Sequence, residues 1–220
     1  MKHSAIEPEP HEAGTLCGTG IDLVRRFAKN LGERGEEWGL IGPDEAARLW
    51  SRHILNCALL APELGQERTA AAQPRLRVAD IGSGAGLPGL VLAMIRPDCD
   101  FVLIEALERR VRWLRDQVEA LGLANVEVFA GRAEGYPAKR SCDVVTARAV
   151  KALKVLIPWA EPLAANGGRL LLLKGQRVDD EIAEARTILR KHKLVDAHSK
   201  TLGLGIVEEP TRIFAATVER

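Results

Sequence analysis

The residues best suited to binding a ligand are the glycines of the segment from Asp80 to Gly89, which reads DIGSGAGLPG. Glycine has no side chain, so it lets the backbone turn sharply and approach a ligand closely. An apolar run typical of a buried strand precedes the segment, and a helical pattern follows it. Open α/β sheets bind ligands at such turns, outside the carboxyl ends of their strands. The segment therefore predicts a ligand-binding loop.

The spacing of the glycines narrows the class of ligand. A dinucleotide-binding loop follows GxGxxG, but Leu87 stands where the third glycine would be, and the glycines are Gly82, Gly84 and Gly86. The pattern GxxxxGK[ST] is absent, which excludes a nucleoside-triphosphate loop of that type. The spacing instead resembles that of S-adenosylmethionine (SAM) methyltransferases. The alternative is a tight turn between strand and helix that binds nothing.

Two carboxylates beside the loop suit SAM. We expect Asp80 to meet the positively charged amino group of the methionine moiety, directly or through a water molecule. Glu105 ends the next apolar run, where a carboxylate can accept hydrogen bonds from ribose hydroxyls. We assign the two residues that follow, Ala106 and Leu107, to the same site. A solvated Glu105 without a ligand is the alternative.

Two cations, Arg148 and Lys174, end later apolar runs and are predicted as catalytic residues. A guanidinium in this position can bind phosphate or stack on a flipped base, whereas a structural ion pair is the alternative. The sequence has neither the Asn-Pro-Pro-Tyr run of amino-group methylation nor a Pro-Cys nucleophile. No cysteine belongs to a CxxC pair, so we expect neither a zinc site nor a disulfide framework. The four cysteines are Cys17, Cys57, Cys99 and Cys142.

The elements that must position these residues alternate between strands and helices, which predicts βαβ units and a parallel sheet. The strand cores are apolar throughout, as expected where both faces of a sheet are covered. The predicted strands are residues 75–81, 100–106, 126–130, 142–147, 169–173, 194–202 and 212–219. The predicted helices are residues 21–31, 43–59, 87–95, 108–121, 152–163 and 179–192.

Composition and charge limit the remaining possibilities. The 220 residues carry 31 Lys and Arg against 30 Asp and Glu, so any contact with nucleic acid must come from a local patch. We predict a flexible tail at 1–18, a helical extension with a linker at 19–72, and a catalytic domain at 73–220. The first residues lack the apolar core of a secretory signal, and no run is long enough to span a membrane. We expect a soluble cytoplasmic protein.

Several segments together resemble one family, the small-subunit (16S) ribosomal RNA methyltransferase G family, also called glucose-inhibited division protein B. They are DIGSGAGLPG, LIEALERRVRWLR, GRAE, VVTARAV and LLLKG, together with RHILN at 52–56. The resemblance implies a SAM methyltransferase fold with a seven-stranded sheet, mostly parallel, and one reversed strand near the edge. It implies methylation of N7 of one guanine in 16S rRNA, near the decoding site.

Carried over to this chain, the resemblance places Gly82 and Leu87 against SAM and Glu105 at the ribose. It places Ala133 and Glu134 beside the adenine and adds Arg148 to the site. Guanine N7 carries a lone pair and no proton, so the reaction requires no general base, and catalysis should come from alignment and electrostatics.

An RNA substrate requires a basic surface, and residues 132–154 contain six basic but only two acidic residues. The upstream pair of Arg52 and His53 belongs to the family's pattern, although a helical histidine is often only a structural hydrogen-bonding group. The predicted RNA contacts are Arg52, His53, Arg109, Arg110, Arg112, Lys139, Arg140 and Lys151. A solvated helix face is the alternative for the arginines of 109–115.

The chain departs from the family upstream, with Gly39-Leu40-Ile41 in place of Asn-Leu-Thr and Asn56-Cys57 in place of Asp-Ser. We expect 16S rRNA in the small ribosomal subunit as the substrate, and a monomer without metal. Two other functions stay open: a SAM methyltransferase that acts on a small molecule, and a non-enzymatic nucleotide-binding assembly module.

Overall fold

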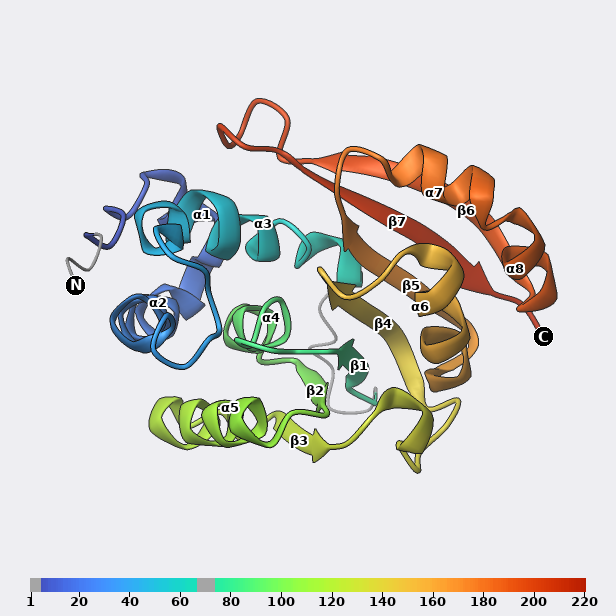
Figure 1. Ribbon diagram of the computed structural model, residues 1–220, viewed down its shortest axis with the longest axis horizontal. Helices are drawn as coiled ribbons and strands as arrows, with labels where there is room; N and C mark the ends of the chain where they lie inside the picture. Colours follow the sequence, from blue (N-terminus) through green and yellow to red (C-terminus); the bar gives the residue numbers. More distant parts are fainter. Residues whose placement is uncertain (1–4, 67–73) are drawn as a thin grey trace.

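The fold is built on one sheet of seven strands in the order β3-β2-β1-β4-β5-β7-β6 (Figure 1). The computed structural model describes residues 5–66 and 74–220. Strand β7 runs antiparallel to both its neighbours, and the remaining pairs are parallel. The expected seven-stranded sheet with one reversed strand is therefore confirmed. The strands are β1 (Leu76–Ile81), β2 (Cys99–Glu105), β3 (Val126–Ala130), β4 (Cys142–Arg148), β5 (Ala164–Lys174), β6 (Leu194–Leu202) and β7 (Thr211–Val218).

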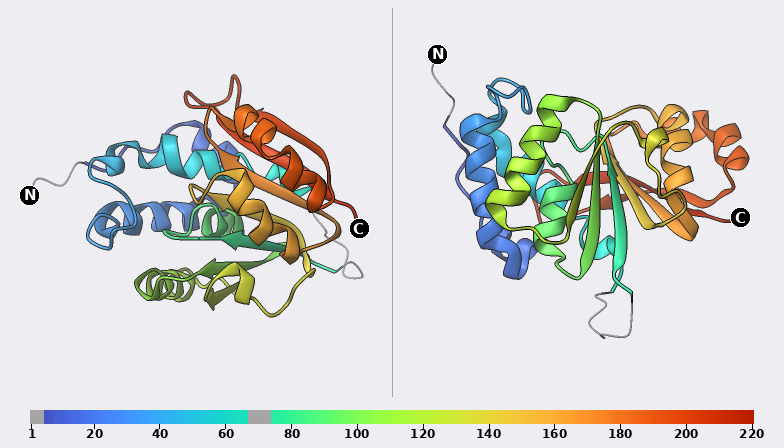
Figure 2. Two further views of the ribbon diagram at one scale, coloured as in Figure 1. Left: turned by 45° about the vertical axis from the view of Figure 1, so that its right-hand side comes forward. Right: turned by 90° about the horizontal axis from the view of Figure 1, so that it is seen from below.

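Helices cover both faces of the sheet, as the views of Figure 2 show. One face packs against α4, α5 and the N-terminal helices, and the other against α6, α7 and α8. Neighbouring residues of a strand point to opposite faces, so Val78 belongs to the first hydrophobic cluster and Ala79 to the second. The helices are α1 (Glu12–Cys17), α2 (Ile21–Arg34), α3 (Leu55–Ala58), α4 (Gly89–Ile95), α5 (Glu108–Leu121), α6 (Leu153–Ala160), α7 (Val178–Glu184) and α8 (Arg186–Lys191).

The N-terminal segment is folded onto the rest of the protein from its first described residues. Residues Glu12–Cys17 form α1, in which Ala13 and Cys17 are fully buried. The backbone N–H of Glu7 donates to the carbonyl of Ala46 at 2.9 Å. The predicted flexible tail is therefore wrong for this part of the chain, because two small residues one helical turn apart pack into the core. Residues 1–4, and residues 67–73 of the predicted linker, lie outside the described residues.

The segment predicted as one helix at 43–59 is irregular. It comprises a 3-10 turn at Glu45–Arg48, a π-helical stretch at Leu49–Ile54 and the short helix α3. The prediction of a single regular helix is therefore wrong. The carbonyl of Arg52 accepts hydrogen bonds from the side chains of Asn56 (2.8 Å) and Arg148 (3.2 Å). The spacing of apolar residues does not reveal such side-chain contacts, so the irregular backbone could not be predicted from it.

No helix of residues 5–66 and 74–220 combines the length and the apolar character needed to cross a membrane.

Candidate functional site

The glycine loop connects β1 to α4 at the carboxyl edge of the sheet, as predicted. Gly82, Gly84 and Gly86 all have positive φ angles, of 67°, 52° and 99°. A Cβ atom on Gly86 would lie 2.3 Å from Leu90 Cδ1, so the missing side chain lets the loop pack against α4. A Cβ atom on Gly84 would meet no atom closer than 3.7 Å, so the loop is open on that side.

Both predicted carboxylates accept hydrogen bonds from backbone N–H groups of the glycine loop. Asp80 is fully buried, and its Oδ2 accepts a hydrogen bond from the backbone N–H of Gly89 at 3.1 Å. Burial raises the pKa of Asp80 to about 7, although the hydrogen bond from the backbone N–H of Gly89 acts in the opposite direction. Glu105 accepts hydrogen bonds from the backbone N–H of Gly84 (3.0 Å) and that of Leu107 (2.8 Å).

A cavity of about 510 Å³ opens above the loop; we call it the loop cavity. It fits SAM on two observations: Gly84 leaves its side of the loop open, and the Oδ1 atom of Asp80 is buried without a hydrogen-bond partner. Its lining comes from the loop, from residues 40–53, from α5 and from the end of β4 with the residue after it: Leu40, Ile41, Gly42, Glu45, Arg52, His53, Gly82, Ser83, Gly84, Ala85, Leu87, Arg110, Arg148 and Ala149. Among the described residues, no group of three or more His, Cys, Asp or Glu could hold a metal.

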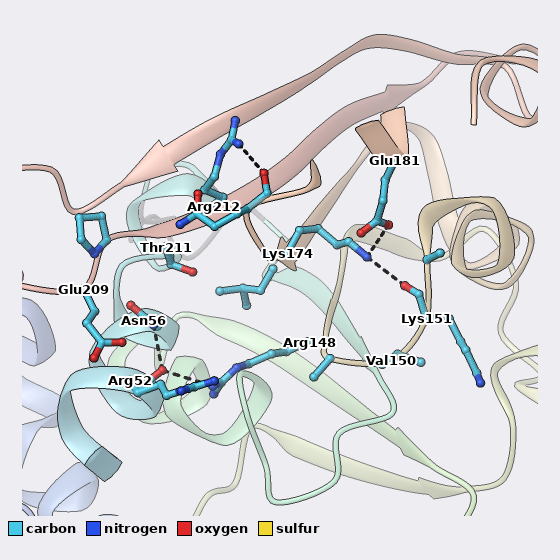
Figure 3. Close-up of a pocket in the computed structure, with 16 residues that line it drawn as sticks. Arg52, Asn56, Arg148, Val150, Lys151, Lys174, Glu181, Glu209, Thr211 and Arg212 are labelled. Atoms are coloured by element: carbon cyan, nitrogen blue, oxygen red, sulfur yellow. Dashed lines mark hydrogen bonds and ion pairs between the residues drawn. The ribbon is translucent and has the colours of Figure 1, made fainter. Parts of the chain in front are cut away.

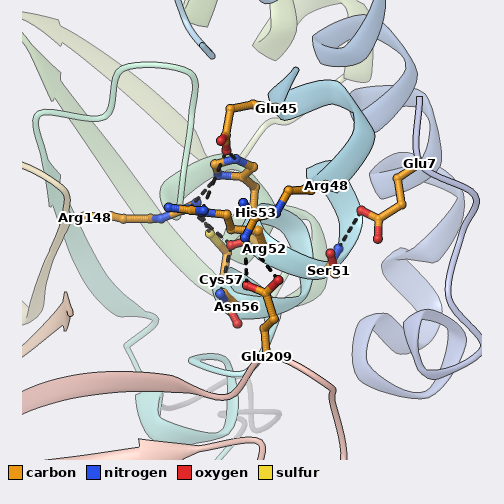
Figure 4. A network of polar contacts seen from close by, with 10 residues as sticks. All are labelled: Glu7, Glu45, Arg48, Ser51, Arg52, His53, Asn56, Cys57, Arg148 and Glu209. Atoms are coloured by element: carbon orange, nitrogen blue, oxygen red, sulfur yellow. Dashed lines mark hydrogen bonds and ion pairs between the residues drawn. The ribbon is translucent and has the colours of Figure 1, made fainter. Parts of the chain in front are cut away.

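Arg148 lies at the end of β4 and is held by the N-terminal segment (Figure 4). Its Nη2 atom lies 2.6 Å from Nδ1 of His53 and 3.2 Å from the carbonyl oxygen of Arg52. Its Nη1 atom donates to Sγ of Cys57 at 3.6 Å. The second ring nitrogen of His53, Nε2, lies 2.5 Å from Oε2 of Glu45. The sequence therefore placed Arg148 correctly beside the loop but did not show what holds it there.

A second cavity of about 670 Å³ adjoins the loop cavity, and we call it the basic cavity (Figure 3). Arg52, Arg148 and Ala149 line both cavities. The charged residues that line the basic cavity are Arg52, Arg148, Lys151, Lys174, Glu181, Glu209 and Arg212. Cations thus outnumber carboxylates, which suits a ligand that carries negative charge.

Lys174 lines the basic cavity but not the loop cavity. Its Nζ atom lies 2.7 Å from Glu181 and donates to the carbonyl of Lys151 at 3.0 Å. The side chain is only 9% exposed. The structural ion pair considered from the sequence is therefore present, and the catalytic role of Lys174 stays a prediction.

Seven of the predicted cofactor residues do not line the loop cavity: Asp80, Gly86, Glu105, Ala106, Leu107, Ala133 and Glu134. Ala106 and Leu107 follow β2, and Ala133 and Glu134 form a 3-10 turn after β3. Leu107 is 56% exposed, so its apolar side chain is largely accessible to solvent.

The predicted RNA contacts separate into groups. Arg110 lines the loop cavity, whereas Arg109 donates to the carbonyl of Glu37 and lies over the ring of Trp38. Arg112, Lys139, Arg140 and Lys151 are exposed, and Lys151 also lines the basic cavity. Arg52 lines both cavities, whereas His53 lines only the loop cavity.

Sequence reasoning missed Glu45 and Arg212. Because β7 is antiparallel to β5, its first residues lie at the carboxyl edge of the parallel strands, and Arg212 pairs in register with Lys174. The reversed strand implied by the family resemblance was a usable signal for Arg212. Glu45 has no comparable signal, because it reaches the site through the irregular backbone of the N-terminal segment.

Comparison with known proteins agrees with this geometry. Residues 21–208 match the family described as "GidB: rRNA small subunit methyltransferase G". The ribosomal RNA small subunit methyltransferase G of Clavibacter sepedonicus is 52% identical over 217 residues, which cover 99% of both chains. That of Mycolicibacterium smegmatis is 41% identical over 219 residues, covering 98% of this chain and 89% of the relative.

Solved structures share the fold at low sequence identity. TYW2 from P. horikoshii in complex with MeSAdo has a TM-score of 0.58 at 12% identity, covering 76% of this chain and 63% of that one. The tRNA (m1A58) methyltransferase TrmI from Aquifex aeolicus has a TM-score of 0.57 at 12% identity, covering 74% and 68%. With the near full-length relatives and the family match, these findings lead to one conclusion: the chain belongs to the rRNA small subunit methyltransferase G (GidB) family of SAM-dependent methyltransferases.

Proposed function

We propose that this protein transfers the methyl group of SAM to N7 of one guanine in the 16S rRNA of the small ribosomal subunit. The observation that carries the proposal is the position of Arg148, whose side chain lines both cavities. A cofactor in the loop cavity and a nucleotide in the basic cavity would meet at this residue. Family membership supports the assignment of rRNA as substrate.

Methylation of N7 requires residues that align the base with the cofactor and attract the base, but it requires no residue that abstracts a proton. Bound SAM supplies a methyl group carried on a positively charged sulfur. Guanine N7 offers a lone pair and no proton, so the chain needs no general base. Arginine donors pair well with guanine O6, the acceptor beside N7. We assign this contact to Arg148, which would fix the base while the glycine loop fixes the cofactor.

The basic cavity supports a phosphate-bearing substrate over a small neutral one. Lys174 pairs with Glu181 at 2.7 Å and Arg212 with Asp179 at 2.7 Å, so both shape the cavity while their charge is partly compensated. Lys151 is exposed at the rim of the cavity. We propose that Arg148 and Lys151 hold the target nucleotide, and that Arg112, Lys139 and Arg140 attract more distant phosphates.

The remaining parts of the proposal follow from the substrate. An enzyme of the small subunit works in the cytoplasm, and the two cavities of one chain suffice for both ligands, so we propose that it acts as a monomer without metal. Ala133, Glu134, Ala106 and Leu107 would contact the adenosine part of SAM at the border of the loop cavity.

Transfer of radioactive methyl from SAM tests the proposal. The substrates are small subunits that lack the modification, the free 16S rRNA and a cell extract of small molecules. We expect label in the rRNA, and labelling that is at least tenfold slower when Arg148 is replaced by Ala. Label only in small molecules would identify a different methyltransferase, and SAM binding without transfer to any fraction would identify a non-enzymatic module.

A further inference from the structure

We propose that His53, supported by Glu45, is a positioning residue for methyl transfer: it holds the guanidinium of Arg148 at the junction of the loop cavity and the basic cavity. The inference rests on the proposed function, because it assigns Arg148 to the target guanine. It gives His53 a role in the reaction, although the residue lies on the N-terminal segment and not on the sheet that carries the glycine loop.

The groups that hold Arg148 are all uncharged acceptors. They are Nδ1 of His53, the carbonyl oxygen of Arg52 and the thiol of Cys57. Within residues 5–66 and 74–220, no carboxylate lies within ion-pair distance of Arg148, whereas Lys174 and Arg212 each have one. Neutral acceptors fix the direction of a guanidinium without cancelling its charge. Arg148 is thus both fixed and able to attract the electron-rich edge of a base.

The contact also fixes the protonation of His53. A guanidinium can only donate hydrogen bonds, so Nδ1 must accept, and the proton of the neutral ring is on Nε2. There it faces Oε2 of Glu45, at 2.5 Å. Burial alone would raise the pKa of Glu45, but the contacts with His53 and Arg52 outweigh it and lower the pKa. Glu45 therefore stays an acceptor and holds the ring in the tautomer that Arg148 requires.

Protonation of His53 would remove the acceptor. The charged groups that face the ring are Glu45, Arg52 and Arg148. Burial and the charge of Arg148 lower the pKa of His53 below its ordinary value, against the opposing influence of Glu45. A proton on Nδ1 would set an N–H against the guanidinium and push Arg148 out of the junction. The structure thus links the position of Arg148 to the neutral form of His53.

Three substitutions separate positioning from simple support of the fold. His53→Asn keeps an acceptor at the δ position, toward Arg148. His53→Gln moves the amide toward Glu45, and His53→Ala removes both contacts. Single-turnover rates are measured on small subunits that lack the modification, at saturating SAM and subunit. We expect a loss of about tenfold or more for His53→Ala and His53→Gln, since a hydrogen bond of a charged group is lost, and substantial recovery in His53→Asn. His198→Ala, a substitution of an exposed histidine on β6, serves as the control and should keep the wild-type rate.

The pH profile of the same rate tests the claim without relying on a substitution. Because the pKa of His53 lies below its ordinary value of about 6.5, we expect the wild-type rate to fall only as pH decreases through the range below that value, and the His53→Asn rate to stay level there. A wild-type profile that parallels the His53→Asn profile down to the lowest pH at which both proteins remain folded, or equal rates for His53→Ala and wild type, would overturn the proposal. A wild-type protein that transfers no methyl group to small subunits would instead contradict the proposed function.

Discussion

The carboxylate of Asp80 and the backbone N–H of Gly89 join the two ends of the glycine loop by a hydrogen bond of 3.1 Å. Gly89 is the first residue of α4, so the carboxylate lies at the positive end of a helix that begins directly above the sheet. A Cβ atom on Gly89 would lie 2.7 Å from Oδ2 of Asp80, so only glycine allows this approach. A buried carboxyl group therefore ties the two ends of the loop together.

This buried acid should make stability depend on pH. Burial raises the pKa of Asp80 to about 7, so above its unfolded pKa of 3.8 the folded protein keeps a proton that the unfolded chain releases. The free energy of unfolding therefore falls as pH rises from about 4 to about 7 and is level above that range. Relative to Asp80→Asn, the wild type should lose on the order of 3–4 kcal/mol across this range. Urea unfolding of both proteins at pH 5 and pH 8 should show the part of this loss that falls between these pH values, on the order of 2–3 kcal/mol. Parallel changes in the two proteins would contradict the prediction.

A side chain on Gly84 should block the cofactor without unfolding the loop. Asparagine tolerates the positive φ angle of this position better than other residues do, and its side chain would enter the open space beside the loop. We expect Gly84→Asn to fold and to lose SAM binding in titration calorimetry. Gly122→Asn at the end of α5 is the matched control, because this position has a positive φ angle and open space but does not line the loop cavity. Wild-type affinity in Gly84→Asn would place SAM elsewhere.

The arginines of α5 should differ in what they bind. Arg110 lines the loop cavity, whereas Arg112 is exposed outside it. We expect Arg110→Met to weaken SAM binding and Arg112→Met to leave it unchanged. For RNA, Arg112→Met should reduce the salt dependence of binding by about one phosphate contact. Equal SAM affinities for the two variants would contradict a contact between Arg110 and SAM, and would leave Arg110 only a diffuse attraction for RNA phosphates.

The sequence was sufficient for most of the sheet and for the loop, because both depend on local signals. Helix α5 and strand β3 have the predicted bounds, 108–121 and 126–130. The N-terminal segment was harder, because its irregular turns are stabilised by distant side chains such as that of Arg148. The break at Ala185, which divides the helix predicted at 179–192, likewise has no glycine or proline to mark it.

The candidate site residues also divide into those that local sequence signals could place and those that depend on contacts between distant segments. Arg148 could be placed from the strand that it ends, whereas its partner His53 lies 95 residues away in sequence. Arg110 and Arg112 are two positions apart on a helix, and sequence alone could not tell which one faces the cavity, because the position of α5 relative to the loop is a tertiary property.

Arg148 should matter for the chemical step more than for RNA affinity. Its guanidinium is directed at the junction of the two cavities, so Arg148→Ala removes a charge-assisted contact with the target base. Such a contact is worth about 1.5–3 kcal/mol, which corresponds to a loss of roughly tenfold to a hundredfold in single-turnover rate. Quench-flow measurement on saturated complexes gives this rate. A normal rate with only a changed salt dependence would make Arg148 a peripheral phosphate contact.

Because guanine N7 has no proton to lose, the rate of the chemical step should not require a basic side chain. At saturating SAM and subunit, we expect a single-turnover rate that is constant within about twofold from pH 7 to pH 9. A rate that rises tenfold per pH unit across this range would indicate that the enzyme removes a proton from its substrate, and would exclude direct attack by N7.

Identification of the methylated nucleoside tests the central claim most directly. Small subunits that lack the modification are incubated with the wild-type protein and labelled SAM, and the 16S rRNA is then digested to nucleosides and separated. We predict that all label elutes as N7-methylguanosine, and that borohydride and aniline treatment of the intact rRNA cleaves the chain at a single guanine. Label in any other nucleoside, or no label in the rRNA of a protein that binds SAM, would contradict the account.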